Sequence, residues 1–373
     1  MASDQIPWAD PKAQMRRHES AILGRIQHVM ASGRYILGPE VTGFESEFAA
    51  FLGIEHCVGV GSGTDAVALA LRAVGIGPGD EVLTVSHSAV ATVAAIELIG
   101  AIPAFVDIDP VTRCMDPARL AGSISRKTRA VVPVHIYGHP CDMRAIRTIA
   151  DQYGLKVVED CAQAHGASID GRMVGTFGHA AAFSFYPTKN LGALGDGGAV
   201  VSADPEIAAR VRWLREYGWK ERYISSMPGT NSRLDEIQAA ILRVKLPHLL
   251  ADNERRRALA GIYEDRLSRI VVTPRMPGTN LLHAMHLYVI ECPERMALQE
   301  YLRAQGIATA VHYPQAIHEQ AAYRDRIRGG ADLPQTERLY RAILTLPMYP
   351  ELTDEAVLRV SSAIEAWHAG KPC

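Results

Sequence analysis

The sequence predicts an α/β fold: a large domain with a mostly parallel mixed sheet between helices, followed by a smaller α+β domain. Short runs rich in Val, Ile and Ala alternate with helical patterns through the first two-thirds of the chain. This alternation then stops, and long helical patterns follow. The length of 373 residues is sufficient for two domains.

The expected strands of the large domain are short and apolar. They cover residues 57–60, 81–85, 102–106, 129–134 and 155–159. The expected helices between them cover residues 65–73, 89–99 and 143–153. Because the strands are continuously apolar rather than alternating with polar residues, we expect both faces of the sheet to be covered by helices.

The last third of the chain has a different pattern. Residues 204–216 and 235–266 have long helical patterns with charges on one face, and residues 286–290 form the next extended apolar run. A final helix is expected over 354–367. We therefore predict a large domain over residues 1–250, including an N-terminal helical segment, and a small C-terminal domain over 251–373.

Composition and charge exclude several classes of protein. The formal net charge of −2 offers no electrostatic basis for binding nucleic acid or an anionic membrane. The longest apolar stretches are shorter than the ~20 residues that a membrane span needs. The N-terminus lacks the pattern of a signal peptide. The six cysteines are scattered without a CxxC pair, so we expect reduced thiols and a cytoplasmic protein.

One histidine pair could suggest a metal. His283 and His286 stand three residues apart, but no cysteine or carboxylate accompanies them at ligand spacing. No metal site is therefore expected.

The most informative residue is Lys189. An apolar run ends at Ser184, and Lys189 follows in a loop that is dense in glycine. The expected strand 155–159 leads directly into Asp160, Gln163 and His165. A strand-end aspartate can simply cap a turn, but a lysine and an aspartate in these places suit pyridoxal phosphate (PLP). The amine forms a Schiff base, and the carboxylate keeps the pyridine nitrogen protonated.

Two further strand ends carry polar residues. Residues 61–65 form a Gly/Ser turn before a helix, whose free amides suit a phosphate, although such a turn can also cap a helix without any ligand. His87 and Ser88 follow strand 81–85 and could be a simple N-cap. Because ligands bind beyond the carboxyl ends of parallel strands, four polar ends at one edge favour a binding site.

These motifs resemble the PLP-dependent sugar aminotransferase family (the DegT/DnrJ group), which has the type I fold of PLP aminotransferases. The resemblance runs nearly from end to end. Its motifs are Gly38-Pro39-Glu40-Val41, Gly63-Thr64-Asp65-Ala66, residues 77–82, 133–138, Glu159-Asp160 with 163–166, 183–198, 231–240, 312–314 with His318 and Gln320, and Leu346-Pro347-Met348.

The resemblance implies a role for each matching residue. Lys189 would form the Schiff base and move the proton, Asp160 would pair with the pyridinium nitrogen, and Gln163 would bond the ring oxygen of the cofactor. The phosphate would be held by Gly63, Thr64, Asp65 and Ser184. Asn231 would reach the phosphate from a partner subunit, which implies a homodimer with shared active sites. The residues expected to line the substrate site are His165, Tyr186, Tyr217, Tyr223, Tyr313 and His318.

Two positions depart from the family pattern. Ala89 stands where the family usually has an aromatic residue near the cofactor ring, and either His87 fills that space or the pocket is wider. Cys161 replaces the usual alanine after Asp160. Neither change removes a residue that the expected chemistry requires.

The resemblance also indicates a reaction. Some relatives have His in place of the Schiff-base lysine and act as dehydratases, so Lys189 favours transamination. Residues 217–223, 229–236 and 191–198 resemble the enzymes that aminate C3 of a dTDP-3-keto-6-deoxyhexose, with L-glutamate as the donor and a dTDP-3-amino-3,6-dideoxyhexose as the product. The alternatives are a C4 nucleotide-sugar or cyclitol aminotransferase, and a catalytically silent PLP-binding regulator.

Overall fold

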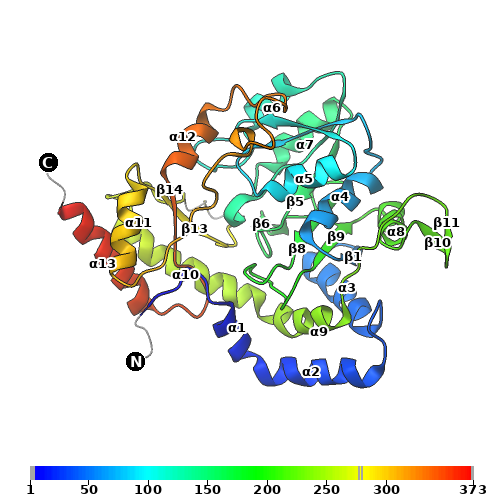
Figure 1. Ribbon diagram of the computed structural model, residues 1–373, viewed down its shortest axis with the longest axis horizontal. Coiled ribbons are helices and arrows are strands. Elements are labelled where there is room, and N and C mark those ends of the chain that lie inside the picture. The colour runs from blue at the N-terminus through cyan, green and yellow to red at the C-terminus, as the bar shows by residue number, and fades with distance from the viewer. Residues whose placement is uncertain (1–4, 276–277, 279, 371–373) are drawn as a thin grey trace.

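A seven-stranded sheet forms the centre of the molecule (Figure 1). The computed structural model describes residues 5–275, 278 and 280–370. The strand order is β1-β9-β8-β5-β4-β2-β3, and only β9 runs antiparallel to its neighbours. The strands are β1 (His56–Val60), β2 (Glu81–Val85), β3 (Ile102–Val106), β4 (Thr128–Val131), β5 (Lys156–Asp160), β8 (Ala180–Ser184) and β9 (Gly198–Ser202). The predicted mostly parallel mixed sheet is confirmed.

Helices cover both faces of this sheet. Side chains alternate along each strand, so that Ala182 in β8 faces one layer while Phe183 faces the other. The first layer contains α4 (Gly63–Ala73), α5 (Val90–Leu98) and α8 (Pro205–Leu214). The second contains α3 (Pro39–Leu52), α6 (Pro117–Ser123), α7 (Met143–Gln152) and α9 (Glu236–Lys245). Burial on both faces explains the continuously apolar strands.

Two strands differ from the sequence-based expectation. The strand expected over 129–134 ends at Val131, two residues before Pro133, which has no amide N–H to donate to a ladder. β9 was not predicted, because it follows a glycine-rich loop without an intervening helical pattern. It returns antiparallel between β8 and β1.

The expectation of a single long helix over 235–266 is wrong in one respect. It is two helices, α9 and α10 (Leu249–Leu267), joined by the short 3-10 turn η2 (Leu246–His248). Pro247 lies in this turn, and a proline cannot donate the amide hydrogen bond that a continuous helix requires.

The C-terminal part has its own apolar cluster. β13 (Tyr288–Glu291) pairs antiparallel with β14 (Ile343–Leu346), and Tyr263 of α10 stacks on Tyr288 with ring centroids 4.8 Å apart. The helices of this part are α10, α11 (Arg295–Ala304), α12 (Pro334–Ala342), the 3-10 turn η3 (Ile317–Glu319) and α13 (Asp354–Ala369). The domain boundary near residue 250 stays a prediction, and residues 1–4, 276–277, 279 and 371–373 of the two expected domains lie outside the described residues.

Smaller elements surround the sheet. The N-terminal helices α1 (Pro11–Arg17) and α2 (Glu19–Ser32) precede α3, and α2 lies alongside α9 (Figure 1). A small sheet contains β6 (Ser168–Ile169), β7 (Arg172–Met173) and β12 (Leu281–Leu282). The hairpin of β10 (Trp219–Glu221) and β11 (Ile224–Ser225) projects beside α8 (Figure 1).

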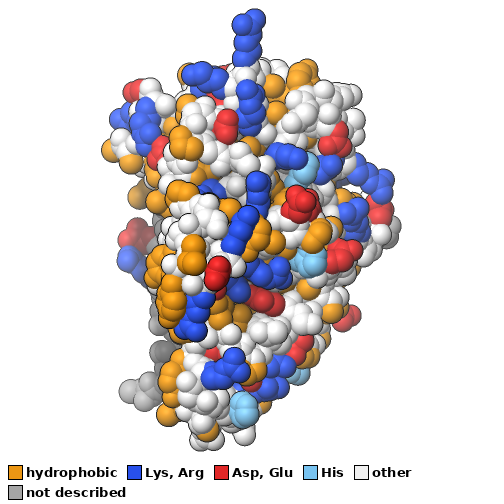
Figure 2. All heavy atoms as spheres, turned by 90° about the vertical axis from the view of Figure 1, so that its right-hand side faces the viewer, with side chains coloured by type: hydrophobic (Ala, Val, Ile, Leu, Met, Phe, Trp, Pro, Cys, Tyr) orange, Lys and Arg blue, Asp and Glu red, His pale blue; other side chains and the backbone are white. Residues whose placement is uncertain are grey.

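The face that carries this hairpin has a mixed surface. Figure 2 shows hydrophobic side chains beside Lys and Arg side chains, with acidic groups among them. Among the described residues, no helix is long and apolar enough to cross a membrane.

Glu236 joins α9 to the start of α3. Its carboxylate accepts hydrogen bonds from the amides of Gly38 (2.8 Å), Glu40 (3.0 Å) and Val41 (2.9 Å), and its side chain is buried. These are amides that a helix N-terminus leaves without intrahelical partners. One side chain therefore satisfies the whole first turn of α3.

We predict that Glu236→Ala lowers the free energy of unfolding by roughly 2–4 kcal/mol, because several buried amides lose a charged acceptor. Urea denaturation followed by circular dichroism measures this change. Glu355→Ala is the matched control, since Glu355 also lies in the first turn of a helix but is exposed, and its effect should stay within about 0.5 kcal/mol. Equal effects of the two substitutions would contradict the prediction.

Candidate active site

The parallel strands bring the sequence-predicted residues to one edge of the sheet. Asp160 is the last residue of β5 and Ser184 is the last residue of β8. His87 follows β2, and the N-terminus of α4 follows β1. Because these strands all run in the same direction, their carboxyl ends lie together.

Lys189 lies in the loop after β8 and is partly buried. Its amide donates to the carbonyl of Tyr186 (2.8 Å). Burial lowers the pKa of Lys189 to about 8, and the nearby Asp160 carboxylate opposes that shift. At pH 7 about a tenth of this amine is therefore unprotonated and nucleophilic, a far larger share than for a lysine with the ordinary pKa of about 10.4.

Asp160 is held by two donors. Its Oδ2 accepts from the hydroxyl of Thr92 (2.8 Å) and its Oδ1 from the amide of Ala162 (3.1 Å). Ser88 bonds the same Thr92 hydroxyl (3.0 Å). The carboxylate is buried and fixed in direction, as a partner for a cationic ring nitrogen needs to be.

Gln163 connects two tyrosines beside this carboxylate. Its Oε1 accepts from the amide of Tyr137 (2.6 Å), and its Nε2 donates to the hydroxyl of Tyr313 (3.1 Å). Burial raises the pKa of Tyr313 to about 12, and Asp160 adds to this shift. Lys189, Asp160, Gln163 and Tyr313 thus form one cluster, which joins the large domain to residues beyond 310.

A cradle for an anion is present at the start of α4. Ser62 caps the helix by accepting from the amide of Asp65 (3.1 Å), which leaves the amides of Gly63 and Thr64 available in the first turn. A Cβ atom at Gly63 would come within 2.5 Å of the Cβ of Ser184, so glycine is needed for this close approach. The Asp65 carboxylate accepts instead from the Ser232 hydroxyl (2.7 Å).

Several expected substrate residues are buried. His165 is enclosed by the rings of Phe183 and Phe185, and burial lowers its pKa to about 3. Neither of its ring nitrogens has a hydrogen-bond partner among the described residues. His318 bonds the hydroxyl of Ser86 through Nδ1 (2.8 Å). Their substrate contacts stay predictions.

Other expected residues lie on the surface. Tyr186 and Asn231 are exposed, and so are Tyr217 and Tyr223 at the β10–β11 hairpin. Trp219 lies between these last two tyrosines, with a ring centroid 5.1 Å from each. These ring contacts lie within the hairpin region, and the substrate contacts of both tyrosines stay predictions.

His87, two residues before Ala89, is fixed by a neighbouring tyrosine. His87 is buried, and its Nε2 bonds the hydroxyl of Tyr137 (2.9 Å), whose ring lies edge-on to it. Burial lowers the pKa of His87 to about 3, so this imidazole is neutral. Cys161 is a buried thiol whose pKa burial raises. It is unreactive near neutral pH.

One buried group has the residue types of a metal site. His135, Glu159 and Cys161 lie close together. The ring of His135 bonds Glu159 (3.1 Å), and the carboxylate also accepts from the amides of Gly175 (2.9 Å), Phe177 (2.8 Å) and Gly178 (2.7 Å). These bonds give Glu159 a structural role in holding the turn before β8.

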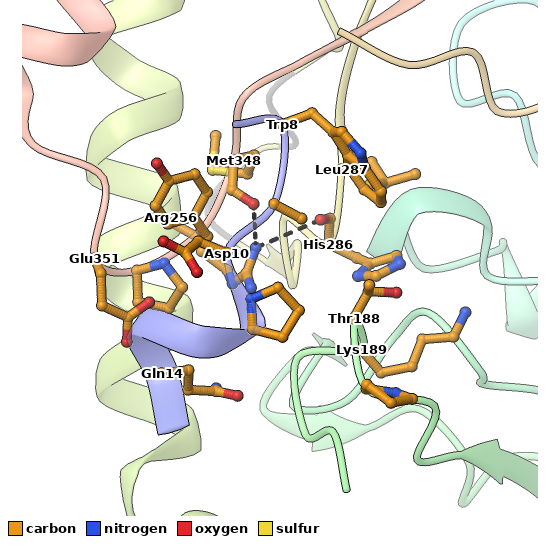
Figure 3. A pocket seen from close by; sticks show the side chains of 15 residues that line it. Trp8, Asp10, Gln14, Thr188, Lys189, Arg256, His286, Leu287, Met348 and Glu351 are labelled. Atoms are coloured by element: carbon orange, nitrogen blue, oxygen red, sulfur yellow. Dashed lines mark hydrogen bonds between the residues drawn. The ribbon is translucent and has the colours of Figure 1, made fainter. Parts of the chain in front are cut away.

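A small polar cavity of about 20 Å³ lies behind Lys189 (Figure 3). The residues around it include Gln14 of α1, Thr188, Arg256 of α10, His286 and Glu351. In Figure 3 the Lys189 side chain extends away from Arg256 and Glu351. The cavity therefore lies on the side of the lysine loop away from the Lys189 amine.

Sequence reasoning missed the groups that hold the site in place. They are Thr92, Tyr137, Asn190 and Asn253. Only Asn190, directly after Lys189, had a local signal, because a polar residue followed the lysine in an otherwise apolar and glycine-rich loop. Tyr137 lies in the family motif 133–138, which assigned it no supporting role, and Thr92 and Asn253 lie within helices whose patterns indicate no ligand.

The geometry fits pyridoxal phosphate. A lysine with a lowered pKa shares a cluster with a fixed carboxylate, as the Schiff base and the ring nitrogen require. The cradle at the start of α4, where a Cβ at Gly63 would clash with Ser184, offers helix amides to a phosphate. A loop lysine, a strand-end carboxylate and an anion cradle therefore meet at one edge.

Comparisons with known proteins agree with this arrangement. The model of the DegT/DnrJ/EryC1/StrS aminotransferase family matches residues 16–365. The dTDP-3-amino-3,4,6-trideoxy-alpha-D-glucose transaminase of Streptomyces venezuelae is 46% identical over 366 residues, which cover 97% of this chain and 96% of that protein.

Solved structures are similar over the whole chain. The crystal structure of S. venezuelae DesV in complex with a ketimine intermediate has a TM-score of 0.96 at 45% identity and covers 100% of both chains. The structure of NtdA from Bacillus subtilis with bound cofactor PMP has a TM-score of 0.91 at 30% identity, covering 98% of this chain and 86% of that chain.

The lowered pKa of Lys189 predicts a pH profile. Below pH 8 the protonated, unreactive form of the amine predominates, and above it the free amine predominates, so the rate at which PLP attaches to the cofactor-free protein should rise and then level off above about pH 8. A lysine with the ordinary pKa of about 10.4 would keep gaining reactivity. Borohydride reduction at timed intervals, followed by mass spectrometry of the Lys189 peptide, measures this rate.

Exposed Lys127 in the same digest serves as the reference for surface labelling. A Lys189 rate that still rises between pH 9 and 10.5 would show that the amine is not desolvated.

Proposed function

Because the chain belongs to the DegT/DnrJ/EryC1/StrS aminotransferase family, we propose that it transfers an amino group from L-glutamate to the C3 keto group of a dTDP-3-keto-6-deoxyhexose. The product is a dTDP-3-amino-3,6-dideoxyhexose. The chain is a PLP-dependent transaminase. The observation that carries the proposal is the partly buried Lys189, with its pKa near 8, in one cluster with Asp160. The name of the S. venezuelae relative supports the C3 position and the dTDP carrier.

Each residue of the cluster has a proposed task. PLP, when bound, supplies an electron sink for the carbon that exchanges the nitrogen. Asp160 would hold the ring nitrogen in its charged form, and Thr92 and Ala162 fix the direction of its carboxylate. Lys189 takes a proton at Nζ and returns it, because an amine with a pKa near the working pH can do both.

The phosphate and the ring oxygen are held by other residues. Gly63 and Thr64 offer amides to the phosphate, and the Ser184 hydroxyl lies beside them. Gln163 has one donor direction left after its bond to Tyr313, and this N–H suits the ring oxygen. Asp65 belongs to the first turn of α4. Its carboxylate accepts from Ser232 and would repel a phosphate, so the carboxylate is not a phosphate ligand.

We propose a homodimer with shared active sites. Large apolar side chains are exposed on and after α2 and on α9: Leu23, Met30, Tyr35, Ile36 and Ile237. Asn231 is exposed next to Ser232, which is anchored beside the α4 N-terminus. The exposed Tyr217 and Tyr223 of the hairpin would face the sugar or the nucleotide in a partner's site.

The proposed compartment is the cytoplasm. Cys57, Cys114, Cys141 and Cys161 are buried thiols that form no disulfide bond. Buried free thiols without disulfides are typical of proteins in a reducing compartment.

A coupled assay tests the proposed reaction. Purified protein with PLP and glutamate is supplied with a dTDP-3-keto sugar or a dTDP-4-keto sugar, 2-oxoglutarate release is followed, and NMR locates the new amine. We expect turnover with the 3-keto sugar and an amine at C3. Lys189→Ala is the control and should lose several orders of magnitude of activity. An amine at C4, or turnover of neither sugar, would refute the proposal.

A complementation experiment tests the shared site. Lys189→Ala and Asn231→Asp are each expected to be inactive, the second because a carboxylate then faces a dianionic phosphate. After the two variants are mixed and re-associated, one site of each mixed dimer has both wild-type residues. Activity should return to up to about half of the sites of the mixed dimers, as two-fold symmetry requires. A mixture as inactive as its parents would place Asn231 and Lys189 in one chain's site.

A further inference from the structure

A buried amide junction lies directly beside Lys189. Asn190 is only 3% exposed, and its carboxamide makes three hydrogen bonds. Its Nδ2 donates to Oδ1 of Asn253 (2.7 Å) and to the carbonyl of Ala284 (2.8 Å), while its Oδ1 bonds Nδ1 of His286 (3.0 Å). One side chain thus joins the lysine loop to α10 and to the segment that leads into β13.

The junction also reaches the segment that carries Asp160. Asn253 donates through Nδ2 to the carbonyl of His165 (2.7 Å). Gly166 lies against this amide with a φ of +76°, and a Cβ there would come within 2.7 Å of Nδ2 of Asn253. The chain can approach Asn253 this closely only because residue 166 is glycine.

The remaining side of the junction supports Gln163. The amide of Ala284 donates to the carbonyl of Gly138 (3.0 Å), and the amide of His286 donates to the carbonyl of Tyr137 (2.9 Å). Tyr137 in turn donates its own amide to Gln163. The loops that carry Lys189, Asp160 and Gln163 therefore share one support.

The hydrogen bonds fix the proton position on His286. The carbonyls of Ala284 and His165 can only accept, so both N–H bonds of Asn190 Nδ2 are used and its Oδ1 must accept. His286 therefore carries its proton on Nδ1. Burial, with Lys189 nearby, holds the pKa of His286 well below its usual value, so the ring is neutral and Nε2 keeps a lone pair.

We propose that Asn190 and His286 are positioning residues for Lys189, which fix the lysine loop relative to the Asp160 and Gln163 segments. This inference rests on the proposed function, because it assigns to Lys189 the amine that reacts. Figure 3 shows His286 beside Thr188 and Lys189, at the edge of the small cavity. Removing the Asn190 carboxamide would leave buried polar groups without partners and free the loop to shift. A displacement of about 1 Å at a reacting group costs roughly 100-fold in rate.

Two substitutions at His286 distinguish positioning of the lysine loop, which uses Nδ1, from a direct contact of Nε2 with the cofactor or substrate. Asparagine places its Nδ2 where histidine has Nδ1, so His286→Asn keeps the donor to Asn190 and removes Nε2. Glutamine places a polar group near Nε2, so His286→Gln loses the donor to Asn190. We expect His286→Gln and Asn190→Ala to lower kcat by roughly 10- to 100-fold with little change in KM, and His286→Asn to recover most of that loss.

A second measurement does not depend on turnover. At limiting PLP, borohydride reduction and peptide mass spectrometry give the fraction of Lys189 that carries cofactor. This fraction should fall for Asn190→Ala and His286→Gln and recover for His286→Asn. Tyr263→Phe is the matched control, because it also removes a buried bond from α10 to a backbone carbonyl, that of Pro347 (3.1 Å), away from the junction. It should lower the urea midpoint without changing labelling or kcat.

The outcomes are distinct. Asn190→Ala with wild-type kcat and labelling overturns the proposal, and so does an active His286→Gln beside an inactive His286→Asn. If Asn190→Ala does not fold, the comparison of His286→Asn with His286→Gln tests the proposal. If the wild-type protein labels at Lys189 but aminates none of the sugars, the proposed function fails, while the labelling of the variants still tests the junction.

Discussion

The common direction of the strands is the constraint on which the active site depends. β1, β2, β4, β5 and β8 all end at the same edge of the sheet, and only β9 runs the other way. Residues more than a hundred positions apart therefore meet at this edge. Asp160 and Ser184 are the last residues of their strands, and Gly63 lies at the helix start that follows β1 and approaches Ser184 closely. The cluster around Lys189 follows from this topology.

Burial determines the electrostatics of that cluster. His165, His286 and His312 are close enough to Lys189 for its charge to lower the pKa of each, and burial is the largest cause in every case. Three neutral imidazoles thus surround the amine without adding charge. Asp160 is the anion that acts on Lys189, so the balance between desolvation and this single carboxylate places the pKa of the amine near 8.

The strands and helices of the large domain were predictable because their apolar patterns are local. Strands 81–85 and 102–106 were predicted with their observed bounds. The break at Pro247 was also readable from the sequence, yet the helical period on both sides masked it. β9 could not be predicted in the same way. It follows a loop rather than a helix, and it runs antiparallel to both of its neighbours, so it does not continue the alternation of strands and helices.

The sequence by itself determined which residues can do the chemistry: a lysine in a glycine-rich loop, an aspartate at the end of a strand and a glutamine shortly after it. The tertiary structure decided what holds them. Thr92 lies 68 positions from Asp160, and Asn253 lies 63 positions from Asn190. Such pairs form only where helices and loops cross in the folded chain. A hydrogen bond depends on distance and direction in space, which local pattern does not encode.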